Sequence, residues 1–224
     1  MSLIYIFISI IFGYIIGSIP TALIIGKISK GIDIREFGSK NSGATNAGRI
    51  LGRKYFFIVT IIDAIKCILG MLLSYVLYIL FFYKFEISNN EYTLAISCAG
   101  TFAMIGHCYP IFADFRGGKG VATALGYLFL TTPLCGLGVV IIFAFVSLKS
   151  KYISLGSIIG SIFTILYTWI IFFIFKENYT IMCLNLVNSL GFAIITTLFA
   201  LTVILKHIPN IKRLINKCEN KINF

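Results

Sequence analysis

The chain has 224 residues, of which 58% are hydrophobic and only 12% are charged, and its mean hydropathy is +0.96. A soluble domain carries about 25% charged residues, so this composition excludes one and predicts an integral membrane protein. The net charge of +11 does not indicate nucleic acid, because basic residues in short loops set the orientation of a membrane protein.

Seven apolar stretches predict an all-α, polytopic integral membrane protein with about seven transmembrane helices, some of them short or partial. The stretches occupy most of the chain, so we expect residues 1–224 to form a single transmembrane domain. The first one lacks a basic flank and a cleavage site, which favours a retained span over a signal peptide. They lie at residues 3–25, 55–83, 93–112, 121–132, 134–148, 154–175 and 186–206.

The fourth stretch is predicted to enter the membrane only partway. About 11 residues at about 1.5 Å each are too short to cross a hydrocarbon core of about 30 Å. A half-helix that starts at Gly117 would direct its free N–H groups toward an anion bound at membrane depth.

The distribution of basic residues predicts the orientation. Sixteen of the nineteen Lys and Arg residues fall at 27–54, 116–119, 149–151 and 206–221, which alternate spans place on one side. An odd number of spans puts the two termini on opposite sides. The positive-inside rule then predicts an external N-terminus and a cytoplasmic C-terminus. The three exceptions are Lys66, Lys84 and Lys176.

The cysteines predict neither a disulfide nor a metal site. None has CxxC spacing, and most lie in apolar runs, where cysteine packs as a small hydrophobic residue. The six are Cys67, Cys98, Cys108, Cys135, Cys183 and Cys218.

Residues 38–49, GSKNSGATNAGR, form the first polar segment that indicates a binding site. Its small residues let backbone N–H groups approach a ligand, and Arg49 offers a bidentate fork for phosphate. Neutral hydrogen bonds would come from Ser39, Asn41, Thr45 and Asn46. A flexible, solvated loop is an equally good interpretation of this segment alone.

Residues 107–123, HCYPIFADFRGGKGVAT, contain a glycine-rich turn with one lysine. Gly117 and Gly118 would supply N–H donors and Lys119 a cation for an anionic ligand. The turn is not a Walker A loop, because GxxxxGK[ST] is absent, so nucleotide binding is not supported. A plain turn between two helices is the alternative.

Two later segments add polar groups to apolar helices. Ser154 and Ser157 lie three residues apart and would share one helix face, although serines in membrane helices more often serve packing. His207 and Asn210 would also point the same way, and His207 could donate to a phosphate or carry a proton. The alternative for this tail is lipid headgroup binding.

Asp63 and Lys66 lie inside the second span, where ionisable side chains need partners or a function. At this spacing on a helix the two can pair with each other, and we favour a structural ion pair over direct chemistry.

Taken in order, these segments resemble the bacterial acyl-phosphate-dependent glycerol-3-phosphate acyltransferases, the PlsY family. The likeness runs from GSIP at 17–20 to HIPNI at 207–211 and so covers nearly the whole chain. The sequence departs from the family pattern in two places. Lys40 stands where the family has glycine, and Lys217-Cys218 precede Glu219 where the family has Gly-Thr before glutamate.

The resemblance implies transfer of a fatty acyl group from acyl phosphate to the 1-hydroxyl of glycerol 3-phosphate. The products are lysophosphatidic acid (1-acylglycerol 3-phosphate) and phosphate, and the reaction is the first step of phospholipid synthesis. The expected location is the cytoplasmic face of a bacterial inner membrane. The expected partners are acyl phosphate, glycerol 3-phosphate and membrane lipids, with no cofactor, no nucleic acid and a monomeric protein.

Residue by residue, the resemblance assigns catalysis and substrate binding to the segments above. An acyl phosphate is already activated, so the site must mainly position two anions and stabilise charge. The expected catalytic residues are Ser39, Arg49, Lys119, His207 and Asn210. Substrate binding is expected from Asn41, Thr45, Asn46, Gly117, Gly118, Lys119, Ser154 and Ser157.

The general base is left open, between a histidine and the phosphate of the donor itself, and we favour the phosphate. We interpret Ser39 as a ligand rather than a nucleophile, because no His or Asp lies at a suitable local spacing. The main rival function is a transporter for a phosphorylated solute. A structural membrane protein would leave the clustered motifs unexplained.

Overall fold

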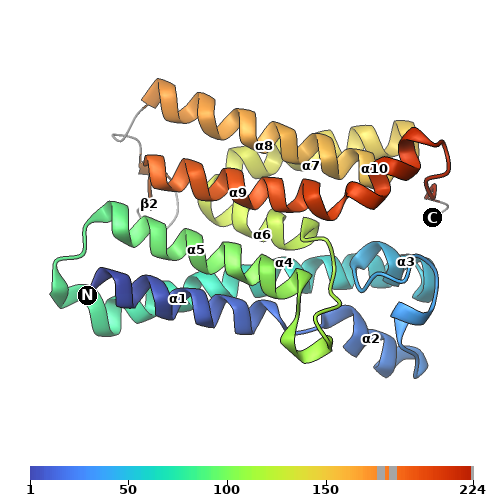
Figure 1. Cartoon of the computed structure of the whole chain (residues 1–224), viewed down its shortest axis with the longest axis horizontal. Coiled ribbons are helices and arrows are strands. Elements are labelled where there is room, and N and C mark those ends of the chain that lie inside the picture. Colours follow the sequence, from blue (N-terminus) through green and yellow to red (C-terminus); the bar gives the residue numbers. More distant parts are fainter. Residues whose placement is uncertain (176–179, 182–185, 223–224) are drawn as a thin grey trace.

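The computed structural model describes residues 1–175, 180–181 and 186–222, and within these ranges the chain is a bundle of helices. The helices run side by side along the long axis of the molecule (Figure 1). The N-terminus lies at one end of the bundle and the C-terminus at the other (Figure 1).

The longer helices are α1 (Ser2–Gly17), α2 (Thr21–Lys30), α3 (Ala44–Leu51), α4 (Arg53–Leu77), α5 (Asn89–Cys108), α6 (Val121–Thr131), α7 (Pro133–Ser150), α8 (Ile153–Phe175), α9 (Leu190–Lys206) and α10 (Ile208–Ile215). Short turns of helix lie at η1 (Ile34–Glu36), η2 (Tyr78–Phe82), η3 (Tyr83–Phe85) and η4 (Ile111–Ala113). Between α8 and α9, β1 (Thr180–Ile181) pairs antiparallel with β2 (Leu186–Val187).

The predicted membrane class is confirmed by helix length and composition. Within the described ranges, five helices are long and apolar enough to cross a membrane, and six if the bent pair α9–α10 counts as one span. The shorter apolar helix α6 has only 11 residues, as the fourth predicted stretch requires. Six of the seven predicted stretches therefore correspond to one apolar helix each, α4 to α9, and the first, 3–25, covers parts of α1 and α2.

The first predicted stretch, 3–25, is broken in the structure. Helix α1 ends at Gly17, and α2 begins at Thr21 after Pro20. Proline has no N–H to donate and disfavours helix at the residue before it, so a break here is expected physically. Lys66 of α4 donates to the carbonyl of Ile19 at 3.0 Å, and this bond links the segment between α1 and α2 to α4.

The half-helix predicted to start at Gly117 starts later, at Val121. Asp114 and Phe115 both have positive φ, and Gly120 at the N-cap has a φ of +84°. Left-handed residues cannot continue a right-handed helix, so residues 114–120 form an irregular loop before α6.

Small residues allow the closest helix contacts. Gly13 and Gly17, one turn apart on α1, face the backbone of Ala99 and Ala103 on α5. A Cβ at either glycine would overlap the carbonyl oxygen of its partner alanine. Close approach of backbones through small residues is a common way for membrane helices to associate.

The predicted pair in the second span is confirmed. Lys66 Nζ lies 2.8 Å from Asp63 Oδ1, and both side chains are buried. Lys66 also lies 3.0 Å from His107 Nδ1 on α5, so the pair links α4 to the helix that precedes the 114–120 loop.

We predict that Gly17→Val destabilises the bundle by about 3 kcal/mol, because the added atoms overlap a backbone that has no room to move. Thermal unfolding in detergent should show a clearly lower Tm. The matched control is Gly191→Ala in α9, where a Cβ would meet Leu94 at an ordinary 3.6 Å. Equal Tm values for the two variants would contradict this account of the α1–α5 contact.

Candidate active site

One cavity of about 270 Å³ gathers most of the predicted site residues. It lies among α3, α4, α6, α7, α8, α9 and α10. Gly117 and Gly118 do not line it, whereas the other predicted residues do. The lining includes Ser39, Asn41, Thr45, Asn46, Arg49, Lys119, Ser154, Ser157, His207 and Asn210.

Lys119 is held in the cavity by a chain of hydrogen bonds. Its Nζ donates to Asn210 Oδ1 at 2.6 Å, and Asn210 Nδ2 donates to Glu219 Oε1 at 2.7 Å. Burial lowers the pKa of the Lys119 ammonium to about 8, and the nearby Glu219 carboxylate opposes that shift. Lys119 is therefore a cation near neutral pH that loses its charge in mildly alkaline solution.

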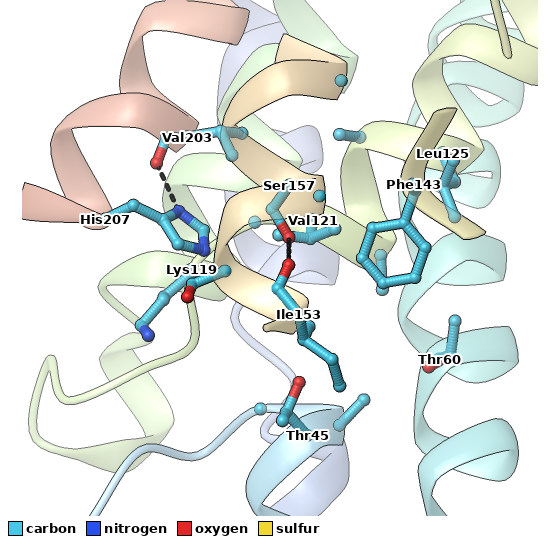
Figure 2. Close-up of a pocket in the computed structure, with 18 of the residues that line it drawn as sticks. Thr45, Thr60, Lys119, Val121, Leu125, Phe143, Ile153, Ser157, Val203 and His207 are labelled. Atoms are coloured by element: carbon cyan, nitrogen blue, oxygen red, sulfur yellow. Dashed lines mark hydrogen bonds between the residues drawn. The ribbon is translucent and has the colours of Figure 1, made fainter. Parts of the chain in front are cut away.

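His207 lies at the junction of α9 and α10, where the chain bends by 51°. Its Nδ1 is 2.8 Å from the carbonyl oxygen of Val203. Because that oxygen can only accept, Nδ1 carries a proton and donates it, which leaves Nε2 as the nitrogen available to a ligand. Figure 2 shows this bond and places the His207 ring next to Lys119.

Arg49 reaches the cavity from α3. This helix begins at Ala44, so Thr45 lies in its first turn and Arg49 about one turn later. Arg49 Nη2 donates to the carbonyl of Asn220 at 3.3 Å. Burial lowers the pKa of the guanidinium, but an arginine stays charged at physiological pH.

Asn46 holds the loop that precedes α3. Its Oδ1 accepts from the Ser39 N–H at 2.9 Å, and its Nδ2 donates to the carbonyls of Ile34 and Phe37. These bonds occupy both amide donors, so in this structure Asn46 positions Ser39. Its predicted contact with substrate stays a prediction.

Ser154 and Ser157 share a face of α8, as predicted, but they make different bonds. Ser154 Oγ donates to Glu219 Oε1 at 3.0 Å. Ser157 Oγ donates to the carbonyl of Ile153 within its own helix, which is the backbone bonding expected of a serine in a membrane helix.

Gly117 and Gly118 pack beneath His107 instead of facing the cavity. The N–H of Gly118 donates to the carbonyl of His107 at 3.0 Å, and a Cβ on Gly118 would overlap the His107 ring. The N–H group of Gly118, predicted to bind an anionic ligand, therefore already donates to His107. Val121 and Ala122 line the cavity instead, in the first turn of α6, where N–H groups have no intrahelical acceptor.

Two of the three residues that depart from the family pattern share one backbone property. Lys40 has a φ of +57° and Lys217 a φ of +55°, in the left-handed region that glycine adopts without penalty. Both lysine side chains are exposed. The chain therefore keeps the backbone shape of the glycine pattern at a cost of about 1 kcal/mol per position.

Sequence reasoning missed part of the polar lining. Glu219 accepts from Arg213 Nε at 2.7 Å, and both residues line the cavity together with Asp63 and His107. The signal for Glu219 was its place at the glutamate of the family pattern. The position of Arg213 in the cavity wall, by contrast, depends on the bend between α9 and α10, which the spacing of residues in the sequence does not predict.

The cavity continues from these polar groups into an apolar groove. Figure 2 shows Lys119 and His207 on one side and Phe143 and Leu125 on the other. The apolar lining comes from Phe56 and Phe57 of α4, Leu125 and Leu128 of α6, Val139, Val140 and Phe143 of α7, and Phe199, Ala200 and Val203 of α9. The site is thus cationic at one end and hydrocarbon-like at the other.

In the described part of the chain, no three His, Cys, Asp or Glu side chains cluster as metal ligands would. Cys67, Cys98, Cys108, Cys135 and Cys218 are free thiols. Cys183 and Lys176 lie outside the described residues.

The model of the glycerol-3-phosphate acyltransferase family matches residues 7–217. The chain belongs to this family. The glycerol-3-phosphate acyltransferase of Bacillus subtilis (strain 168) is 38% identical over 96% of both chains. The enzyme of that name from Acholeplasma laidlawii is 38% identical over 99% of this chain and 95% of its own.

Two solved structures of PlsY, an integral membrane glycerol 3-phosphate acyltransferase, share the fold. Its glycerol 3-phosphate form superposes with a TM-score of 0.79 at 30% identity, covering 97% of this chain and 96% of the other. Its lysophosphatidic acid form gives 0.77 at 29% identity, covering 97% and 95%. The predicted resemblance to the PlsY family is confirmed, and this glycerol-3-phosphate acyltransferase is an integral membrane enzyme rather than a transporter.

We predict that Lys40→Gly raises the stability of the acyltransferase by about 0.5 kcal/mol, because glycine adopts the left-handed backbone without strain. Lys27→Gly, an exposed position inside α2, should instead lower stability by about 1 kcal/mol. Thermal unfolding in detergent compares the two. A lower Tm for Lys40→Gly would contradict the assigned backbone conformation.

Proposed function

We propose that the chain transfers a fatty acyl group from an acyl phosphate to the 1-hydroxyl of glycerol 3-phosphate. The products are lysophosphatidic acid and inorganic phosphate, the first step of phospholipid synthesis. The observation that carries the proposal is the single cavity that joins Arg49, Lys119 and His207 to an apolar groove. One end suits phosphate groups and the other suits a fatty chain. The bound forms named for the PlsY relatives, one polar and one acylated, fit the same division.

Two phosphorylated substrates bring several negative charges into one site, and clustered cations with N–H donors offset their repulsion. In the proposed reaction Lys119 and Arg49 bind these phosphates. Ser39, Asn41, Thr45 and the second Nδ2 hydrogen of Asn210 supply neutral hydrogen bonds. Ser154 and Ser157 line the same cavity, but their hydroxyl hydrogens are donated to Glu219 and to the Ile153 carbonyl. The first turn of α6 adds backbone N–H groups near the developing oxyanion.

The chemical step is attack of the glycerol hydroxyl oxygen on the acyl carbonyl carbon. The new ester C–O bond forms as the bond from that carbon to the phosphate oxygen breaks, and inorganic phosphate leaves. We propose that the donor phosphate takes the hydroxyl proton, with His207 as a phosphate ligand through Nε2. A His207→Gln variant that kept glycerol 3-phosphate affinity but lost nearly all turnover would make His207 the base instead.

We propose that the enzyme is a monomeric, single-domain protein of the bacterial inner membrane. Helices α2, α3 and α10 and the C-terminus lie at the end of the bundle opposite the N-terminus (Figure 1). Residues 27–54 and 206–221, which contain α3, α10 and the basic residues of α2, carry twelve of the nineteen Lys and Arg residues. The positive-inside rule therefore supports a cytoplasmic position for this end of the bundle and for the cavity. The N-terminus is then external.

The function is tested with purified protein, glycerol 3-phosphate and palmitoyl phosphate. We expect lysophosphatidic acid by mass spectrometry and an equal amount of released phosphate. Palmitoyl-CoA and palmitoyl-acyl carrier protein serve as alternative donors and should give no product. Arg49→Met should reduce kcat/KM at least about a hundredfold, the scale of losing a charged transition-state contact. Equal turnover with palmitoyl-CoA would refute the acyl phosphate as the specific donor.

The pH dependence tests the role of Lys119. Because its pKa is about 8, the Lys119 ammonium loses its proton above that pH and no longer binds phosphate. We expect kcat/KM for glycerol 3-phosphate, which reports the free enzyme, to fall above about pH 8. In Lys119→Arg the guanidinium stays charged, so this fall should disappear, whereas the control Lys84→Arg should keep it. An unchanged profile in Lys119→Arg would exclude Lys119 as the titrating group.

A further inference from the structure

The C-terminal tail folds back onto the polar end of the cavity. After α10 ends at Ile215, Lys217 turns the chain with its left-handed backbone, and the Cys218 N–H donates to the carbonyl of Arg213. Farther on, the Ile222 N–H donates to the carbonyl of Lys151 at 2.9 Å, between α7 and α8. The tail is thereby fixed at both ends, and Glu219 and Asn220 between them line the site.

Glu219 is the central contact of this tail. Its side chain is only 4% exposed. Oε1 accepts from Asn210 Nδ2 at 2.7 Å and from Ser154 Oγ at 3.0 Å, while Oε2 accepts from Arg213 Nε at 2.7 Å. Burial alone would raise the pKa of this carboxyl, but these hydrogen bonds lower it below its ordinary value, so Glu219 is a carboxylate.

The carboxylate fixes which way the Asn210 amide faces. A carboxylate can only accept and an ammonium can only donate, so an amide between them has one satisfied orientation. Nδ2 must face Glu219 and Oδ1 must face Lys119, which are the contacts at 2.7 Å and 2.6 Å. Without the carboxylate, the amide could rotate and present N–H groups to the lysine.

We propose that Glu219 is a positioning residue for acyl transfer, whose carboxylate orients Asn210 so that the amide holds the Lys119 ammonium in the cavity. The inference rests on the proposed function of the site. Ser154 is held by the same carboxylate, and the next residue, Asn220, accepts from Arg49. One short stretch of tail thus connects three of the predicted phosphate-binding groups.

The other charged groups around Lys119 make the Glu219 carboxylate important for keeping the lysine protonated. Three cations act on the lysine, from Arg49 of α3, Lys206 of α9 and Arg213 of α10, and Glu219 is the carboxylate that counters them. His207 lies beside Lys119. The buried Asp63 also lines the cavity and is paired with Lys66. Removal of the Glu219 charge would leave Lys119 facing mainly positive groups, which favour its neutral form.

Glu219→Gln tests the proposal through the pH profile of kcat/KM for glycerol 3-phosphate. We expect the midpoint of the alkaline fall to move down by about one pH unit, the low end for loss of a close opposite charge. This shift corresponds to about a fivefold loss at pH 8. Glu219→Asp, which keeps the charge, should restore most of the original midpoint. Glu86→Gln, an exposed glutamate beyond the far end of α4, is the matched control and should leave the profile unchanged.

The same substitution in a Lys119→Arg background separates positioning from packing. There the guanidinium does not titrate, so Glu219→Gln should cause no pH shift. A uniform loss of activity at all pH values, or a shift that persists with arginine, would overturn the proposal. If Glu219→Gln does not fold, Glu219→Asp is used for the test. A Glu219→Asp midpoint that also falls by about one pH unit, as expected for complete loss of the charge, would overturn the proposal.

Failure of the proposed function would look different. The parent protein would then give no product from palmitoyl phosphate at any pH. The pH dependence of glycerol 3-phosphate binding, measured by calorimetry without a donor, reads the same Lys119 charge. Equal binding profiles for the parent and Glu219→Gln would overturn the inference by itself.

Discussion

The site depends on one hydrogen bond, which the Lys119 ammonium donates to the amide oxygen of Asn210. Glu219 accepts a hydrogen bond from the nitrogen of the same amide. A cation at the edge of an apolar bundle is expensive unless it is hydrogen-bonded and countered by charge. The chain meets this demand by bringing the loop before α6, the bent α10 and the tail together. The same arrangement leaves positively charged side chains lining the cavity, and an anionic ligand would balance their charge.

A single short helix, α6, contributes to both the polar end and the apolar groove of the cavity. Helix α6 has only 11 residues, too few to cross a bilayer, and its N-terminal turn lines the cavity together with Lys119. The apolar groove begins on the same helix, at Leu125 and Leu128. In the proposed reaction, a water-soluble phosphate and a fatty chain thus meet at one point.

Hydropathy predicted the helices well, because a membrane demands long apolar runs and leaves few alternatives. The convergence of Arg49 and Lys119 followed from the ordered motifs and their resemblance to a family. The predicted start of α6 and the predicted role of Gly118 were wrong, because backbone geometry determines both. The left-handed residues at 114–115 delay the start of α6, and packing under His107 removes Gly118 from the cavity. The role of Glu219 depends on a tail that folds back, and no local spacing encodes that contact.

We propose that Arg49 and Lys119, which reach the cavity from separate segments, bind one phosphate-bearing ligand together. The most direct measurement is the affinity for glycerol 3-phosphate, without donor, of Arg49→Met, Lys119→Met and the double variant. Residues that share a ligand should be coupled, so the double variant should differ from the sum of the single losses by at least about 0.5 kcal/mol. Strictly additive losses, or a normal affinity in either single variant, would contradict a shared site.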